Sequence, residues 1–159
     1  MEESREKLRV RKIEAGTVID HIPPGRALTV LEILRITPGT DDTVSVLMNV
    51  PSHNREEKDI VKIEDRELKE EEVNQIGLVA PTATINVIEN YEVVEKKEVE
   101  IPEIIEGVVE CSNPGCITNT SEPADLKFEV VSKKPIKLRC SYCERITEES
   151  ELYKQFSGR

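Results

Sequence analysis

The chain has 159 residues, which is enough for one ordinary domain or two small ones. Its 22 lysines and arginines face 32 aspartates and glutamates, and the formal charge of −10 disfavours general binding to nucleic acid, whose phosphates need an excess of cations. No apolar stretch is long enough to cross a bilayer, and residues 1–7 lack a hydrophobic signal segment, so we expect a cytoplasmic protein without membrane contact.

The first hundred residues alternate between strand-like and helix-like patterns. Residues 8–13 and 17–22 are predicted as strands, because apolar and β-branched side chains dominate them and Gly16 breaks the run. A pair of prolines then stops the strand, and residues 26–35 are predicted as a helix packed on a sheet. The apolar face of this helix is predicted to consist of Ala27, Leu28, Leu31 and Leu34.

The same alternation continues through the next segments. Residues 44–48 and 60–63 are predicted as strands, residues 68–79 as a second helix, and residues 82–88 and 91–101 as further strands. The order β-α-β-β-α-β with one more strand predicts an α+β fold, in which an antiparallel sheet carries two helices on one face, as in ferredoxin-like proteins. Two amphipathic helices cover one side of such a sheet, so the other side is left to water or to a partner.

Four cysteines, all in the last third of the chain, predict a metal-binding domain. They occur as Cys111-x4-Cys116 and Cys140-x2-Cys143, with 23 residues between the pairs. Each pair closes a short turn and the loop brings the turns together, which is what one tetrahedral ion needs. Four thiolates leave no open coordination position, so we expect one structural zinc ion and no catalysis at the metal. Two disulfides or an iron–sulfur cluster are the alternatives.

We therefore predict two domains. Residues 1–101 would carry the antiparallel sheet, and residues 102–159 would form a small all-β zinc-binding domain. Within the second domain, residues 128–131 and 136–139 are predicted as a hairpin, and residues 148–156 as a short terminal helix.

The first domain offers little for catalysis. The chain has two histidines, His21 and His53, no assembled set of nucleophile, base and orienting residue, and no glycine-rich phosphate loop. Lys62 stands between Val61 and Ile63, where burial of its ammonium group is costly unless an anion or acceptor meets it. A position on the solvent-exposed face of the sheet would also explain why a lysine occurs here. Other polar residues at predicted strand ends or within strands are Asp20, His21, Asn86, Tyr91 and Lys96.

Several motifs, taken together and in order, resemble the regulatory chain of aspartate carbamoyltransferase. These are residues 16–23, residues 58–64, residues 80–86, residues 90–94 and the spacing of the four cysteines. The resemblance runs from about residue 8 to the terminal helix. It implies a protein without catalysis of its own, in which a nucleotide-binding domain forms homodimers and a zinc domain docks on the catalytic chain.

Carried onto this sequence, the resemblance implies a pocket for nucleoside triphosphate effectors such as CTP, UTP and ATP. Asp20 would accept ribose hydroxyls, Lys62 would donate to the base or ribose, and His21 and Lys96 would meet the phosphates, with Lys97 as the alternative to Lys96. The implied set is Val10, Ile13, Val18, Asp20, His21, Lys62, Asn86, Ile88, Tyr91, Val93 and Lys96.

The resemblance also implies allosteric control of pyrimidine biosynthesis, with the link formed by residues 92–106 carrying the signal between the domains. Two rival functions stay open. One is a zinc ribbon that binds nucleic acid through a basic patch formed by Lys133, Lys134, Lys137 and Arg139. The other is an enzyme that acts alone, which the missing catalytic set and the closed metal shell disfavour.

Overall fold

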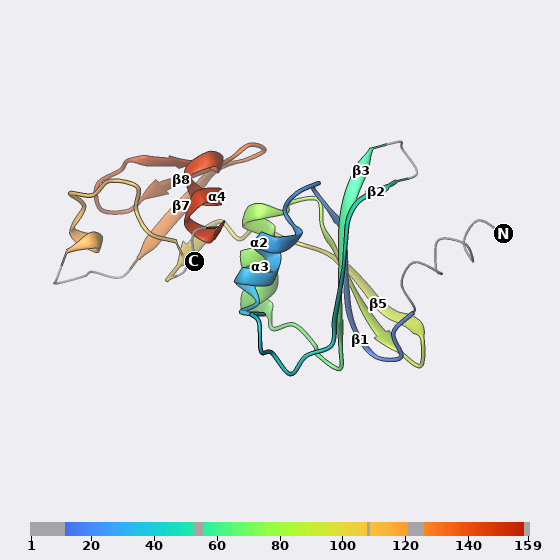
Figure 1. Cartoon of the computed structure of the whole chain (residues 1–159). Helices are drawn as coiled ribbons and strands as arrows, with labels where there is room; N and C mark the ends of the chain where they lie inside the picture. The colour runs from blue at the N-terminus through green and yellow to red at the C-terminus, as the bar shows by residue number, and fades with distance from the viewer. Residues whose placement is uncertain (1–11, 53–55, 108, 121–125, 158–159) are drawn as a thin grey trace.

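The structure is a computed structural model and describes residues 12–52, 56–107, 109–120 and 126–157 (Figure 1). A five-stranded sheet forms the N-terminal part, and every neighbouring pair of its strands is antiparallel. The strands are β1 (Gly16–Ile22), β2 (Val44–Pro51), β3 (Glu57–Glu64), β4 (Thr84–Glu89) and β5 (Glu92–Glu98). Their spatial order is β2-β3-β1-β4-β5, which is the ferredoxin-like order with one strand added at an edge.

Helices α2 (Ala27–Ile33) and α3 (Glu70–Val79) lie on one face of this sheet, and no other described element covers the opposite face (Figure 1). The covered face is apolar. Ile19 is the cross-strand neighbour of both Val61 and Ile85, and all three are almost completely buried. Because side chains alternate along a strand, their sequence neighbours Val18 and Lys62 lie on the open face. The predicted α+β fold with two helices on one face is confirmed.

Several details differ from the sequence predictions. Of the predicted strand 8–13 only residues 12 and 13 are described, and they form no strand, although Ile13 is buried. Strand β3 begins earlier than predicted, at Glu57, and β5 ends earlier, at Glu98. Leu28 is predicted on the buried face of α2 but is 57% exposed, because the side of the helix that the sheet and the other helices cover holds Ala27, Thr29, Val30 and Ile33. Strand β2 extends to Pro51, beyond the alternating residues that predicted it.

A four-stranded antiparallel sheet with the order β6-β7-β8-β9 forms the C-terminal domain. Its strands are β6 (Ile104–Glu106), β7 (Lys127–Lys133), β8 (Ile136–Cys140) and β9 (Ile146–Glu148), with a 3-10 turn η1 (Ile117–Asn119) between β6 and β7. The predicted hairpin is the pair β7 and β8. Strands β6 and β9 were not predicted, since three residues are too few to show a period of two.

The chain continues from β9 directly into helix α4 (Glu149–Ser157), as the sequence predicted for residues 148–156. This helix packs against α2 and α3 of the N-terminal part, and its Leu152 and Phe156 are almost fully buried. The apolar core is therefore one continuous cluster that runs from the first sheet through the helices into the second sheet. None of the helices in the described ranges has the length and apolar character that crossing a membrane requires.

Candidate functional site

The four cysteine sulfurs lie within 4.8 Å of one another. The sulfur of Cys111 is 3.5 Å from that of Cys143, and the sulfur of Cys116 is 3.7 Å from that of Cys140. A tetrahedral zinc ion with its usual bond lengths separates its thiolate ligands by about 3.8 Å. The two sulfurs of a disulfide lie about 2 Å apart. The spacing therefore fits one metal ion and not a pair of disulfides.

Local hydrogen bonds hold the first pair of cysteines in place. The side-chain amide of Asn119 donates to the carbonyl of Cys111 at 2.9 Å and to that of Asn113 at 2.8 Å. The oxygen of the Asn113 side chain accepts the Gly115 N–H at 3.0 Å, and the Cys116 N–H donates to the Asn113 carbonyl. The x4 spacing thus forms a turn that Asn113 and Asn119 close from both sides.

Strand pairing holds the second pair. Cys140 is the last residue of β8 and is the cross-strand partner of Phe128 in β7. The Glu144 N–H donates to the Cys140 carbonyl, and the Cys140 N–H donates to the Arg145 carbonyl, so the x2 knuckle is a hydrogen-bonded turn. Glu144 has a φ of 64°, the left-handed conformation that such a tight turn requires of one residue.

The thiols differ in acidity because their surroundings differ. The Thr118 hydroxyl donates to the sulfur of Cys116 at 3.2 Å and lowers the pKa of this thiol to about 6. A hydrogen bond from the Arg145 backbone lowers the pKa of Cys143, whereas burial raises the pKa of Cys111 to about 12. Buried thiols near donors favour a soft divalent cation, which displaces the remaining protons and neutralises the thiolates.

The open face of the N-terminal sheet brings together most of the residues implied for nucleotide binding. The pairing register places Lys62, Val18, Asn86 and Lys96 side by side on β3, β1, β4 and β5. Direct cross-strand neighbours share a face, so these four side chains form one row across the sheet. Lys97 pairs with Ile85 of the buried row and therefore lies toward the helix-covered side.

Asp20 and His21 lie at one end of this face. A bulge between Ile19 and Ile22 gives His21 a φ of 58°. The ring Nδ1 of His21 is 3.1 Å from the hydroxyl of Thr84, which is the cross-strand partner of Asp20. Asp20 accepts the His21 N–H at 2.6 Å, and its Oδ1 is 3.0 Å from the ammonium of Lys58.

The resemblance implies Lys58 as a lysine near a second, metal-assisted nucleotide and not as a member of the main pocket, and the structure places its ammonium 3.0 Å from Asp20. The antiparallel order of β1 and β3 explains this contact, because it puts the start of β3 next to the end of β1. The Lys58 ammonium supplies positive charge at the same end of the face as His21.

The remaining implied residues lie at the other end of the face. The Tyr91 N–H donates to the Glu14 carbonyl at 2.9 Å, which joins the segment around Ile13 to the turn between β4 and β5. Ile13 and Ile88 are buried, while Tyr91 and Val93 are each 56% exposed. Four residues of β1 separate the two ends, about 14 Å at the rise of an antiparallel strand. Val10, the last member of the implied set, lies outside the described residues.

Two family models match the chain. They are described as "Aspartate carbamoyltransferase regulatory chain, allosteric domain", over residues 8–100, and "Aspartate carbamoyltransferase regulatory chain, metal binding domain", over residues 103–153.

Curated relatives agree with these matches. The aspartate carbamoyltransferase regulatory chain of Pyrococcus horikoshii is 56% identical over 147 residues, which cover 92% of this chain and 96% of the relative. That of Methanothrix thermoacetophila is 56% identical over 148 residues, with the same coverage of 92% and 96%. That of Korarchaeum cryptofilum is 49% identical over 155 residues, covering 97% of this chain and 99% of the relative.

A sheet with an open polar face is joined to a closed four-cysteine centre, and the matching family models describe these parts as an allosteric domain and a metal-binding domain, which is the make-up of a non-catalytic regulatory protein. The chain belongs to the family of aspartate carbamoyltransferase regulatory chains. Cys111, Cys116, Cys140 and Cys143 can hold one ion, and zinc is the usual metal of this family. The prediction of a regulatory chain without catalysis of its own is confirmed.

Proposed function

We propose that the open face of the N-terminal sheet binds nucleoside triphosphate effectors, and that the C-terminal domain passes their effect to a catalytic chain of aspartate carbamoyltransferase. The observation that carries the first part is the row of Lys62, Val18, Asn86 and Lys96 across four strands. It offers cations, an amide and an apolar contact within one surface. Asp20, at the edge of that surface, would accept ribose hydroxyls.

The length of the face suits an elongated ligand. Exposed Tyr91 at one end offers a ring for base stacking, and the polar end offers Asp20, His21 and Lys58. CTP, UTP and ATP share the ribose and triphosphate that these groups would meet and differ in the base. We therefore assign competition among these effectors to one site.

Replacing Lys96 with glutamine is expected to weaken triphosphate binding to the purified chain about tenfold, because one charge-assisted contact is lost. Isothermal titration with CTP and with ATP measures the change. Lys97→Gln is the matched control, since it removes the same charge from the next residue, which pairs with Ile85 on the other side of the strand. Equal losses for the two variants, or a loss for Lys97→Gln alone, would refute this assignment.

The C-terminal domain is the proposed contact with the catalytic chain. Ile117 directly follows the first cysteine turn, and Tyr142 lies within the second. Both are large apolar residues with exposed side chains. Exposed apolar side chains next to a rigid metal centre provide an ordered docking surface. Part of the basic patch on the same sheet is engaged in ion pairs, because Arg139 lies 3.8 Å from Glu129 and the neighbouring Lys127 lies 3.6 Å from Glu106. These pairs disfavour the nucleic-acid function.

Strand β5 is the proposed contact of a homodimer. It is an edge strand in which all seven residues are exposed, including the apolar Val93 and Val94. An exposed edge with open backbone groups and apolar side chains is ready to pair with a second strand. A second copy of this chain supplies the same strand, so two sheets would continue into one another.

Changing Val94 to lysine is expected to convert the dimer into a monomer, because a charge on an edge strand prevents strand pairing. Sedimentation velocity at micromolar concentration measures the mass. Met48→Lys places the same charge on β2, the opposite edge of the sheet, and is expected to leave the dimer intact. A monomeric parent chain, or a dimer that only Met48→Lys dissociates, would contradict the proposal.

We also propose that the domain boundary lies between Ile101 and Pro102 and that the protein works in the cytoplasm. The matches to the two family models end at residue 100 and begin at residue 103, on either side of that boundary. Four free cysteines arranged for a metal suit a reducing compartment.

A further inference from the structure

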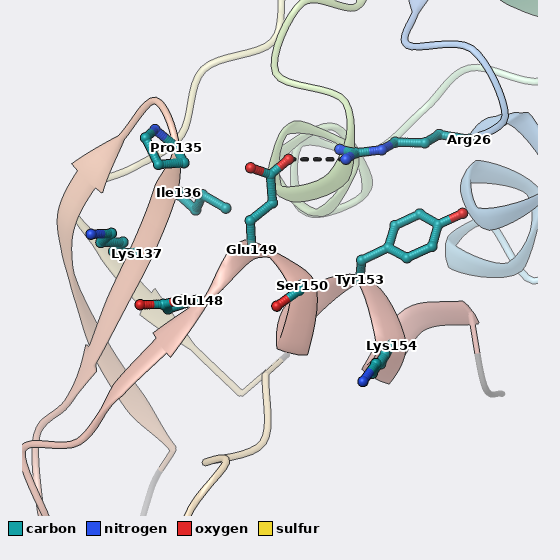
Figure 2. A pocket seen from close by; sticks show the side chains of 9 residues that line it. All are labelled: Arg26, Pro135, Ile136, Lys137, Glu148, Glu149, Ser150, Tyr153 and Lys154. Atoms are coloured by element: carbon teal, nitrogen blue, oxygen red, sulfur yellow. Dashed lines mark hydrogen bonds and ion pairs between the residues drawn. The ribbon is translucent and has the colours of Figure 1, made fainter.

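Arg26 joins the N-terminal helices to helix α4 of the C-terminal domain (Figure 2). Its Nη2 donates to the Glu149 carboxylate at 2.9 Å, and its Nη1 donates to the Val79 carbonyl at 2.6 Å. The guanidinium carbon lies 5.1 Å from the centre of the Tyr153 ring. The Tyr153 hydroxyl in turn lies 3.5 Å from the Gly25 carbonyl. The loop before α2 thus contacts α4 at two of its residues, Glu149 and Tyr153.

The three partners of Arg26 are complementary to a planar cation. Val79 ends α3, where unpaired carbonyls concentrate negative charge, and the last turn of α3 has no basic residue of its own. Glu149 begins α4, and Tyr153 lies one turn later on the same face. With 25% of its side chain exposed, Arg26 is screened from solvent enough for the fork of hydrogen bonds and the ring contact to matter.

A cavity of about 540 Å³ lies where Arg26 meets the C-terminal domain (Figure 2). Among its lining residues, eight belong to the C-terminal domain, from residues 135–137 and 148–154, and Arg26 alone comes from the N-terminal part. Arg26 therefore reaches into a hollow of the other domain. Lys154 also lines the cavity, but its side chain points away from the Arg26–Glu149 pair (Figure 2).

The backbone around Arg26 is fixed by a buried carboxylate. Oδ2 of Asp59 accepts the N–H groups of both flanking residues, Gly25 at 2.9 Å and Ala27 at 3.0 Å. Oδ1 of Asp59 accepts the Asn49 N–H at 2.9 Å, and the side chain is completely buried. The loop that carries Arg26 is thus tied by two hydrogen bonds to the start of β3.

The start of β3 also reaches the polar end of the open face. Lys58 precedes Asp59 and pairs with Asp20, whose Oδ1 lies 3.0 Å from the lysine nitrogen. A continuous series of contacts therefore runs from Asp20 through Lys58 and Asp59 to Arg26 and on to Glu149. The sequence predicts that the link formed by residues 92–106 carries the signal between the domains. This series of contacts is a second connection between the domains, and it includes no residue of that link.

We propose that Arg26 is a positioning residue that locks α4 to the N-terminal helices and that sets how strongly an effector on the open sheet face controls the catalytic chain. The part of this proposal that concerns effectors rests on the proposed function, whereas the contact by which Arg26 holds α4 to the N-terminal helices does not. A ligand that draws on Asp20 or Lys58 shifts the start of β3, and Asp59 transfers that shift to the loop that carries Arg26. The coupling can then act through the orientation of α4 relative to α2 and α3.

The lock is tested without any nucleotide. Arg26→Gln in the zinc-loaded chain is expected to speed hydrogen exchange at the backbone amides of α4 about tenfold, since the helix loses its ion pair and ring contact. Glu149→Gln should give a similar change, and the double variant should give little more than either single variant. Arg26→Lys keeps the positive charge but cannot make both guanidinium hydrogen bonds. Its α4 amides should therefore exchange more slowly than those of Arg26→Gln and faster than those of the parent chain. Lys154→Gln removes a charge from the same cavity and should leave α4 unchanged.

Transmission is tested in the complex with the catalytic chain. Arg26→Gln should keep zinc, assembly and the nucleotide affinity of the chain within about twofold. The response of the complex to saturating CTP or ATP, which allosteric coupling sets at about 5–150-fold, should fall to within about twofold. The inference is overturned if Arg26→Gln shows the same exchange rate at α4 as the parent chain, or if its complex responds to effectors as strongly as the parent complex. If the parent chain binds no nucleotide, the proposed function fails, and the exchange experiment alone decides whether Arg26 locks the domains.

Discussion

Replacing Cys140 with serine is expected to release the metal, unfold the C-terminal sheet and abolish binding to the catalytic chain. Cys140 is completely buried, ends β8, and its sulfur lies 3.7 Å from that of Cys116. A structural zinc ion contributes about 10–16 kcal/mol to folding, which exceeds what a sheet of this size gains from its apolar core. Metal analysis gives the zinc content, hydrogen exchange at β7 and β8 gives the fold, and co-sedimentation gives binding.

Ser141→Ala provides the matched control, since Ser141 is the exposed neighbour of Cys140 in the same turn. It should leave metal content, exchange and binding at parental values. Removing the metal from the parent chain with a chelator should reproduce the effect of Cys140→Ser. A metal-free chain that still binds the catalytic chain normally would refute the structural role assigned to the four cysteines.

Replacing Asp59 with alanine is expected to cost about 3–5 kcal/mol of unfolding free energy. The carboxylate is completely buried and accepts backbone N–H groups from Gly25, Ala27 and Asn49. Alanine leaves three backbone donors without this acceptor, of which the Ala27 N–H is buried and those of Gly25 and Asn49 are part-buried. A buried unsatisfied donor costs about 1–3 kcal/mol, and the two part-buried donors add to that cost. Urea unfolding followed by circular dichroism, at constant zinc concentration, measures the difference.

Two further variants sharpen this test. Glu67→Ala removes an exposed carboxylate near the end of β3 and should change the unfolding free energy by less than about 0.5 kcal/mol. Asp59→Asn keeps one carbonyl oxygen but turns an N–H group toward a donor, so its cost should lie between those of the other two. A loss below about 1 kcal/mol for Asp59→Ala would show that water or another group satisfies the three donors.

The sequence contained enough to predict the N-terminal sheet, because its strands are long and their side chains alternate. It could not predict β6 and β9, which have three residues each and owe their existence to pairing with β7 and β8. Leu28 was misassigned for a related reason. Periodicity shows that a helix has an apolar face, but the neighbouring elements decide which residues at its margin are covered.

The four ligands of the metal centre could be predicted from the cysteine spacing, whereas the sulfur–sulfur distances were needed to exclude a pair of disulfides. The choice between Lys96 and Lys97 could not be made, since adjacent residues differ only in the face they occupy. That face depends on the register of β5 against β4, which shifts between Val87 and Ile88. A one-residue shift exchanges the two faces, and no local pattern in a strand of exposed charges reveals it.

Arg26 and Asp59 had no signal in the sequence that would have singled them out. Glu149 is 123 positions away from Arg26, and Asp59 is 32 and 34 positions away from the two amides that it binds next to Arg26. An arginine in a loop and an aspartate in a strand are ordinary on their own. The role of Arg26 arises from the packing of α4 on the N-terminal helices, and that of Asp59 from the contacts of β3 with the segment around Arg26 and with β2, and both depend on contacts between distant parts of the chain.

The contact of α4 with α2 and α3 has a consequence for a chain deprived of its metal. Leu152 and Phe156 shield apolar surface of the N-terminal helices, and they belong to the part of the chain that the ion organises. Loss of zinc would therefore expose apolar surface on the helices of a folded N-terminal domain. Chains in this state would be prone to aggregate, so a shortage of zinc would reduce solubility as well as regulation.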